Sequence, residues 1–149
     1  MTIIGIDPGP EQSAYCLIGN DYRPHRAAKV DNSELLEIVA ALEESTYLAI
    51  ESIQSYGAPV GRETFETCYQ IGRIQQAATS TGKSFTLYPR PEYSKAICGC
   101  QRVNDAVLRQ ALLLRFGGDR KGEPLHVLKG CSDKRSAFAV AVYHLDKTT

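Results

Sequence analysis

The segment Ile3-Ile4-Gly5-Ile6-Asp7-Pro8-Gly9 begins with an apolar run and ends with a carboxylate followed by turn-forming residues. Its isoleucines predict a buried strand over residues 2–7, which the Pro-Gly pair ends. A carboxylate in that position is costly to bury without a partner, so it favours a nearby cation. Asp before Pro-Gly is also common in ordinary turns. Asp7 therefore becomes informative only together with other acidic residues.

The residues that follow predict an antiparallel meander and then a return to the first strand. Residues 13–19 and 22–30 read as strands joined by the turn residues Gly19-Asn20-Asp21. Asp31 or Asn32 opens a helix, and residues 47–51 form a short buried strand. Because this strand follows a helix, we expect it to lie parallel to the first strand.

The second half of the chain reads as one more strand among helices. We expect a long helix over 63–79, a strand over 84–88, a short helix or turn over 91–98 and a helix capped by Asn104 that runs to 116. A basic, glycine-rich loop over 117–130 precedes a last helix capped by Ser132. The long helix has these candidate buried residues: Phe65, Cys68, Tyr69, Ile71, Ile74, Ala77 and Ala78. The order predicts an α/β fold with a five-stranded mixed sheet, three strands antiparallel and then two parallel.

Three acidic residues stand where strands or helices end. Asp7 and Glu51 each follow an apolar strand, and the carboxyl ends of parallel neighbours meet at one crevice. Asp133 falls in the first turn of the last helix, where it could equally be a helix-dipole acid. Three oxygen ligands from separate segments suit Mg²⁺ or Mn²⁺. One or two such ions can clamp the oxygens of a phosphodiester.

Composition excludes several classes of protein. The 149 residues suit a single domain, 1–149, and none of its apolar runs approaches the ~18 residues of a membrane span. The first residues lack the pattern of a signal peptide, and five scattered cysteines are typical of a reducing, intracellular protein. Cys98-x-Cys100 lacks the spacing and the second half-site that zinc needs, so free thiols are expected.

Charge is unevenly distributed although the formal net charge is zero. Residues 1–60 hold three basic and nine acidic residues, a net of −6, and residues 61–149 hold fourteen and eight, a net of +6. This division is compatible with an acidic metal site beside a surface that binds a polyanion. It is equally compatible with two solvated faces.

A family resemblance runs through nearly the whole chain. It is carried by these segments: Ile4-Gly5-Ile6-Asp7-Pro8-Gly9, Ile50-Glu51, Tyr56-Gly57-Ala58-Pro59-Val60-Gly61, Phe65-Glu66-Thr67-Cys68, Ile71-Gly72-Arg73, Lys95, Cys98-Gly99, Asn104-Asp105, Arg109-Gln110-Ala111-Leu112, Phe116-Gly117-Gly118 and an Asp that opens an Ala-rich last helix. The sequence resembles the RuvC-type Holliday junction resolvases of the RNase H-like (retroviral integrase) superfamily, and in particular their bacteriophage and prophage branch. Actin-like ATPases and sugar kinases open similarly but need a far longer chain.

The resemblance implies an RNase H-like fold with helices on both faces of the sheet, and a metal-dependent crossover junction endodeoxyribonuclease. It implies catalytic and metal-binding roles for Asp7, Glu51 and Asp133, Mg²⁺ or Mn²⁺ as cofactor without an organic one, and 5′-phosphate and 3′-hydroxyl ends. It also implies a homodimer that acts on DNA in the cytoplasm of a bacterial host cell. Cellular members carry a second acid three residues after Asp133; Ser136 stands there and brings no charge, which puts a second metal in doubt.

Basic and aromatic residues supply candidates for DNA contact. The basic candidates are Arg62, Arg73, Arg90, Lys95, Arg102, Arg120, Lys121, Lys134 and Arg135. The aromatic candidates for stacking on unpaired bases are Tyr56, Tyr69, Tyr88 and Tyr93, with packing as the alternative for Tyr69. The long helix has apolar residues to spare for a dimer contact, notably Phe65, Tyr69 and Ile74.

Two other functions are compatible with the same residues. A DNA-binding module without catalysis would explain why Ser136 replaces an acid. A nuclease of looser specificity would cut flaps, branched DNA or an RNA–DNA hybrid.

Overall fold

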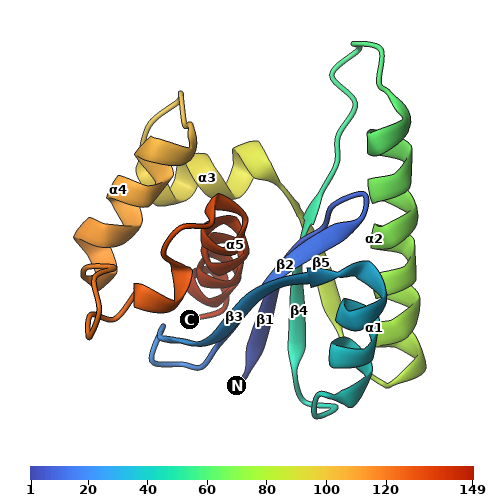
Figure 1. Cartoon of the computed structure of the whole chain (residues 1–149), viewed down its shortest axis with the longest axis horizontal. Coiled ribbons are helices and arrows are strands. Elements are labelled where there is room, and N and C mark those ends of the chain that lie inside the picture. The colour runs from blue at the N-terminus through green and yellow to red at the C-terminus, as the bar shows by residue number, and fades with distance from the viewer.

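All 149 residues are described by a computed structural model, which contains one five-stranded sheet between two groups of helices (Figure 1). The strands are β1 (Ile3–Asp7), β2 (Gln12–Ile18), β3 (Pro24–Asp31), β4 (Tyr47–Ser52) and β5 (Phe85–Pro89). The helices are α1 (Asn32–Ala41), α2 (Arg62–Ser80), α3 (Arg90–Cys98), α4 (Asp105–Phe116) and α5 (Ser132–Thr148), with a 3₁₀ turn, η1, over His126–Leu128. Every expected element is present in the expected order, with ends shifted by at most two residues.

The sheet has the expected mixed topology. Its strand order is β3-β2-β1-β4-β5; β1 and β3 each pair antiparallel with β2, and β4 pairs parallel with β1 and β5. In the parallel β1–β4 pair, Ile6 lies opposite Ile50. Asp7 and Glu51 are the next residues on each strand, so both carboxylates lie at the same edge of the sheet.

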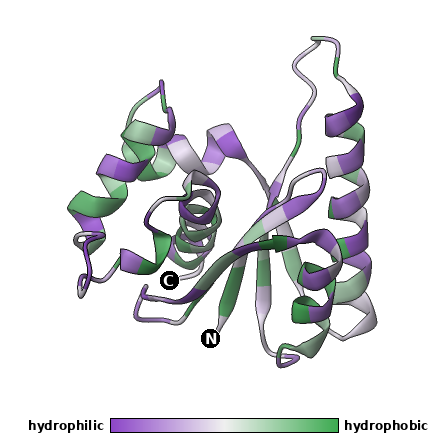
Figure 2. Ribbon diagram, viewed as in Figure 1, coloured by the Kyte–Doolittle hydropathy of each residue, from purple (hydrophilic) through white to green (hydrophobic).

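Two hydrophobic layers cover the two faces of the sheet. On one face, α1 and α2 pack on the cluster that contains Ile4, Ile6 and Ile50. On the other face, the middle of α5, residues 136–142, is buried between the sheet and the α3–α4 pair. Figure 2 shows the central strands β1 and β4 as mainly hydrophobic and much of α2 as hydrophilic. None of the helices has the length and apolar character needed to cross a membrane.

Gly5 sets how closely α5 approaches the sheet. A Cβ atom at this position would lie 1.9 Å from the backbone oxygen of Ala137 and 2.8 Å from the Cβ of Ala141. Only a residue without a side chain permits this approach. Asp133 lies one helical turn before Ala137, and Asp7 lies two residues after Gly5. The contact therefore brings the start of α5 toward the edge of the sheet that carries Asp7.

Four local predictions are wrong. Phe65, Cys68 and Tyr69 are exposed on α2, where Thr67 and Gln70 are buried beside the correctly predicted Ile71, because the buried stripe is rotated away from the first three residues. Ser132 is the first residue of α5 and does not cap it; the N-cap is Cys131, whose side chain makes no capping hydrogen bond.

The segment over residues 117–130 is a loop, as predicted, but it includes a helical turn and buried residues that were not predicted. It contains η1, and it buries Leu125 and Leu128 against the α5 side of the sheet.

Candidate active site

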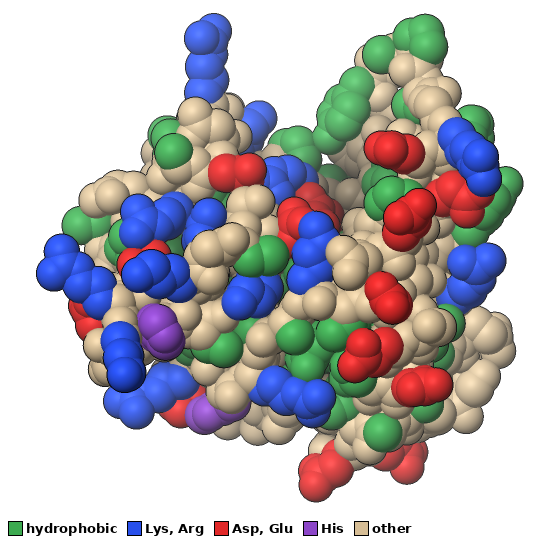
Figure 3. Space-filling view, viewed as in Figure 1, with side chains coloured by type: hydrophobic (Ala, Val, Ile, Leu, Met, Phe, Trp, Pro, Cys, Tyr) green, Lys and Arg blue, Asp and Glu red, His purple; other side chains and the backbone are tan.

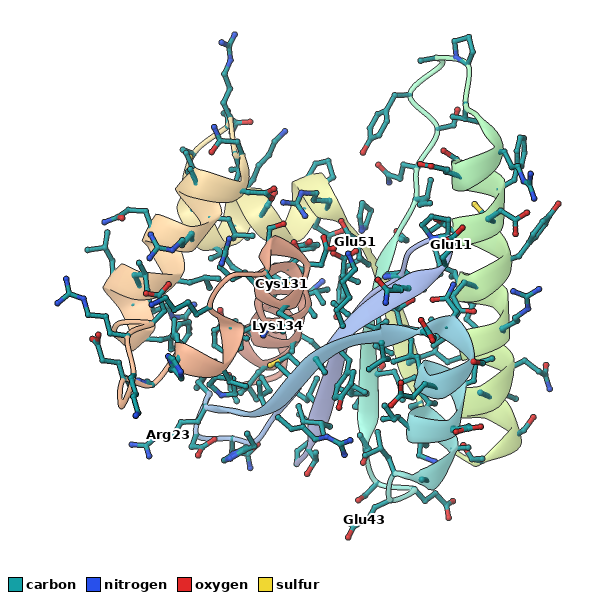
Figure 4. The ribbon with its side chains drawn as sticks, viewed as in Figure 1. Glu11, Arg23, Glu43, Glu51, Cys131 and Lys134 are labelled. Carbon is teal, nitrogen blue, oxygen red and sulfur yellow. The ribbon has the colours of Figure 1, made fainter.

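Asp7, Glu51 and Asp133 line one cleft at the carboxyl ends of β1 and β4. The cleft has a volume of about 380 Å³, and Lys29, Ser52 and Thr67 are among its other lining residues. The three acids come from β1, β4 and the first turn of α5, which are distant in sequence. Figure 4 shows Glu51 between Cys131, at the start of α5, and Glu11, in the β1–β2 turn.

The β1–β2 turn beside Asp7 is fixed by a small hydrogen-bond network. The backbone N–H of Gly9 donates to Ser13 Oγ at 3.3 Å, and Ser13 Oγ donates to Asn32 Oδ1 at 2.7 Å. Asn32 Nδ2 donates to the Gly9 carbonyl oxygen at 3.0 Å, and buried Gln70 donates to the Asn32 backbone oxygen. This network ties the turn to α1 and α2, so the backbone around Asp7 is held in place without any ligand.

Asp7 is electrostatically unusual. Burial raises its pKa well above the ordinary range of a carboxyl group, and a hydrogen bond with Glu51 and the charges of Glu51 and Asp133 raise it further. A buried carboxyl group among other acids either keeps its proton or binds a cation. A divalent ion would relieve the repulsion among all three acids, and oxygen donors are those that Mg²⁺ and Mn²⁺ prefer. The residues at this site therefore fit the expected ions.

The three carboxylates are not gathered at metal-binding distance. No group of three His, Cys, Asp or Glu side chains in the structure is arranged to hold an ion. Lys29, on β3, donates from Nζ to Asp133 Oδ2 at 2.7 Å, and this ion pair raises the pKa of the lysine. Asp133 is thus paired with an ammonium group.

Arg90, at the start of α3, lies on the other side of Glu51. Its Nη1 donates to Ser136 Oγ at 2.8 Å and lies 3.8 Å from Glu51 Oε1, and its Nη2 donates to Asp105 Oδ1 at 2.7 Å. Ser136 is 1% exposed. The side chain that stands where cellular family members carry a second acid accepts a hydrogen bond from this arginine.

The other basic residues proposed for DNA contact occupy different parts of the surface. Lys95, Arg102, Arg120 and Lys121 are exposed on α3 and the loops on either side of α4. Arg62 lines a hollow that adjoins the cleft and shares Lys29 and Gln12 with it. Arg73 is exposed on α2. In Figure 3, blue basic side chains gather over α3, α4 and the following loop, and red acidic ones lie mainly over the α1–α2 side.

Two of the basic candidates near α5 are less available. Lys134 Nζ donates to the Val127 carbonyl oxygen at 2.6 Å, which fastens the η1 segment to α5. Arg135 is half-buried, and its Nε atom has no partner. Only the solvent-exposed part of each side chain remains a candidate for DNA contact.

The tyrosines separate into two groups. Tyr88 and Tyr93 are 5% and 0% exposed, so the prediction that they stack on DNA bases is wrong. Tyr56 is 70% exposed in the loop between β4 and α2, and Tyr69 is 57% exposed on α2. The alternative for Tyr69 was packing in the core or at an interface; its exposure makes the core role wrong and leaves the interface role untested. Tyr56 and Tyr69 remain free to contact a partner.

The sequence reasoning missed Lys29 and Asn32. Lys29 is an exposed residue between two partly buried ones on an edge strand, and its partner lies 104 positions away. Asn32 was expected only to open a helix; its side chain instead holds the turn next to Asp7. A polar residue directly beside a helix start was the only local signal for Asn32.

Comparison with solved structures identifies the fold. The chain is similar to RuvC of Thermus thermophilus, with a TM-score of 0.70, 15% identity, and coverage of 100% of this chain and 98% of that one. It is equally similar to T. thermophilus RuvC in complex with a Holliday junction substrate, at a TM-score of 0.70, 14% identity, and coverage of 100% and 97%. No family model matches the sequence, and no curated protein is significantly similar to it. The chain therefore has the RuvC-type, RNase H-like fold that its sequence predicted.

Proposed function

We propose that this protein is a metal-dependent endonuclease that cuts four-way or branched DNA junctions. The observation that carries the proposal is the cleft in which Asp7, Glu51 and Asp133 meet at the edge of a RuvC-type sheet. One of the similar structures is RuvC in complex with a Holliday junction substrate, which supports DNA junctions as the substrate class. The single domain, 1–149, would carry out both binding and cleavage.

The three carboxylates would hold Mg²⁺ or Mn²⁺. When bound, the ion supplies Lewis-acid stabilisation of charge on the phosphodiester. Burial and the neighbouring acids raise the pKa of Asp7, so any proton that its carboxyl group holds must leave when Asp7 becomes a ligand. Asp133 must exchange its ion pair with Lys29 for the metal, which leaves the ammonium group free to face a phosphate. The expected products carry 5′-phosphate and 3′-hydroxyl ends.

The exposed basic residues on α3, α4 and their loops would bind the phosphates of the junction arms. Contacts of this kind give affinity that falls with salt and depends little on sequence. Tyr56, in the exposed loop between β4 and α2, would stack on an unpaired base near the point of strand exchange. Because β4 ends at Ser52, one residue after Glu51, and the first loop residue, Ile53, lines the cleft, the stacked base would lie near it.

We further propose that two copies act together. Phe65 and Tyr69 are 54% and 57% exposed one helical turn apart on α2, where they form an apolar patch. Ile74, the third residue expected at this contact, is fully buried under α2, so the prediction that it serves a dimer contact is wrong. A twofold axis through this patch would present two clefts to two strands. The resemblance to phage and prophage proteins leads us to propose a bacterial cytoplasmic setting, in which the five free cysteines stay reduced.

A substrate panel tests the proposal. A labelled four-way junction, a flap, linear duplex and an RNA–DNA hybrid are incubated with the protein and Mg²⁺ or Mn²⁺. We expect paired, ligatable nicks in the junction and little cleavage of linear duplex. Preferential cleavage of the flap or of the hybrid would assign the looser nuclease activity instead.

A second function is favoured by two observations. The Lys29–Asp133 ion pair and the absence of an acid at Ser136 both leave the site short of negative charge, as in a DNA-binding module without catalysis. The same panel distinguishes the two: such a module binds the junction tightly and nicks nothing with either ion.

A further inference from the structure

Arg90 occupies a central place in the site. Its guanidinium group joins three elements, because it lies near Glu51 on β4 and hydrogen-bonds to Asp105 on α4 and Ser136 on α5. Arg90 itself is only about one-third exposed. Its Nη1 also donates to the Tyr93 hydroxyl oxygen at 3.4 Å. A group held by four partners at 2.7–3.8 Å is a fixed part of the site rather than a mobile arm that reaches for DNA.

The position of Ser136 shows where the guanidinium group of Arg90 lies relative to the three acids. Ser136 lies three residues after Asp133, so both side chains lie on the same side of α5. An acid at this position would face the same space as Asp133 and Glu51. In this chain the space beside Ser136 is filled by the positive charge of Arg90, which hydrogen-bonds to the serine hydroxyl group.

The charges of the side chains around the cleft also favour a single divalent ion. Asp7, Glu51 and Asp133 bring three negative charges when ionised, and Lys29 and Arg90 bring two positive charges next to them. One divalent ion then brings the net charge of these five side chains and the ion to +1. A second divalent ion on the Ser136 side would lie against the guanidinium group without any added carboxylate to compensate it.

We propose that each chain holds a single divalent ion, carried by Asp7 together with Glu51 and Asp133, and that the guanidinium group of Arg90 takes the place of a second ion on the Ser136 side. This inference rests on the proposed function and specifies how many ions each active site holds. Arg90 acts here as a positioning residue: it fixes the Glu51 side of the cleft and fills the space with one positive charge. The number of ions bound then depends on residues 90 and 136 together.

Calorimetric titration with MnCl₂, without DNA, tests this directly. Four proteins are compared: wild type, Ser136→Asp, Arg90→Gln and the double variant. We expect one ion per chain for the wild type and both single variants, since Arg90 pairs with the new acid in Ser136→Asp. The double variant is expected to bind two ions, because the acid is then present and the guanidinium group is gone. A merely structural role for Arg90 would not produce this gain.

A matched control replaces an arginine away from the cleft. Arg109, on α4, pairs with Asp119 at 2.8 Å, and neither residue lines the cleft. Ser136→Asp combined with Arg109→Gln should still bind one ion. Circular dichroism melting establishes that each variant is folded; if Arg90→Gln is not, Arg90→Met replaces it, and the wild-type stoichiometry remains a test by itself.

Each outcome has a clear reading. Two ions per wild-type chain, with junction cleavage intact, would overturn this inference and leave the proposed function standing. One ion in both the wild type and the double variant would overturn the role of Arg90. A wild-type chain that binds no ion would contradict the proposed function and the inference together.

Discussion

Lys29 and Asp133 are 104 residues apart in sequence and 2.7 Å apart at Nζ and Oδ2. Asp133 is the acid that we propose as the metal ligand from α5, so the ammonium group and the ion would compete for it. Both side chains are 41% exposed, which places the ion pair in the range of surface pairs, about 0.2–1 kcal/mol. The competition should therefore be measurable but modest.

Lys29→Met is expected to tighten Mn²⁺ binding to the DNA-free protein by up to about fivefold, the factor that corresponds to such an ion pair. The side chain keeps a similar length while its charge is removed. Calorimetric titration measures the dissociation constant. Lys129→Met, at an exposed loop position outside the cleft, serves as the control and should change nothing. Weaker binding by Lys29→Met would mean that the lysine supports the ion rather than competing with it.

Asp133→Asn should lower the rate of junction cleavage by at least ~100-fold, an order set by the loss of a ligand to a catalytic metal. The amide keeps the shape of the side chain, and melting should shift little, because α5 remains buried against the sheet. Single-turnover cleavage measures the effect. A loss below tenfold would mean that Asp133 only stabilises the N-terminal end of α5 by interacting with the helix dipole.

Gly5→Ala is expected to destabilise the protein by about 1–3 kcal/mol or more, because the new methyl group meets the backbone oxygen of Ala137. Gly72 is exposed on α2, and an added Cβ atom would have nothing within 4 Å. Gly72→Ala should therefore stabilise the protein by about 0.5–1 kcal/mol, because glycine inside a helix costs conformational entropy. Urea unfolding compares the two. Equal stability of Gly5→Ala and wild type would show that α5 does not depend on this close approach.

Phe65→Glu should convert the protein from a dimer to a monomer, because it places a charge in the exposed apolar patch of α2. Light scattering then gives about 16.4 kDa in place of twice that mass. Leu114→Glu is the matched control, since Leu114 is 79% exposed on α4, and it should remain a dimer. The dimer proposal is untenable if the wild type itself scatters as a monomer at micromolar concentration.

Sequence alone predicted the topology because each strand is marked locally. Apolar runs such as Ile3-Ile4 and Leu48-Ala49-Ile50 end in acids, glycines or prolines, and these signals need no knowledge of the partner strand. The alternation of helices and strands then left few topologies to consider. The placement of Asp7, Glu51 and Asp133 in one cleft followed from that topology.

The errors arose where orientation depends on distant contacts. The spacing of Phe65 and Tyr69 fits a helical stripe, but periodicity does not indicate which of two possible stripes faces the sheet. Arg90 was grouped with the DNA-binding residues because its partners, Glu51 and Ser136, lie 39 and 46 positions away. Lys29 belongs to an edge strand that shows only a weak alternating pattern, so nothing local connected it with Asp133.

The central claim is that the acids in this cleft hold the ion that cleaves a DNA junction. The most direct measurement compares wild type with Asp7→Asn and Glu51→Gln on a labelled synthetic four-way junction in Mn²⁺ or Mg²⁺. These substitutions remove charge and keep shape, so we expect the wild type to introduce paired nicks and both variants to bind the junction with unchanged affinity without cutting it. Cleavage by either variant at a rate near that of wild type would contradict the account.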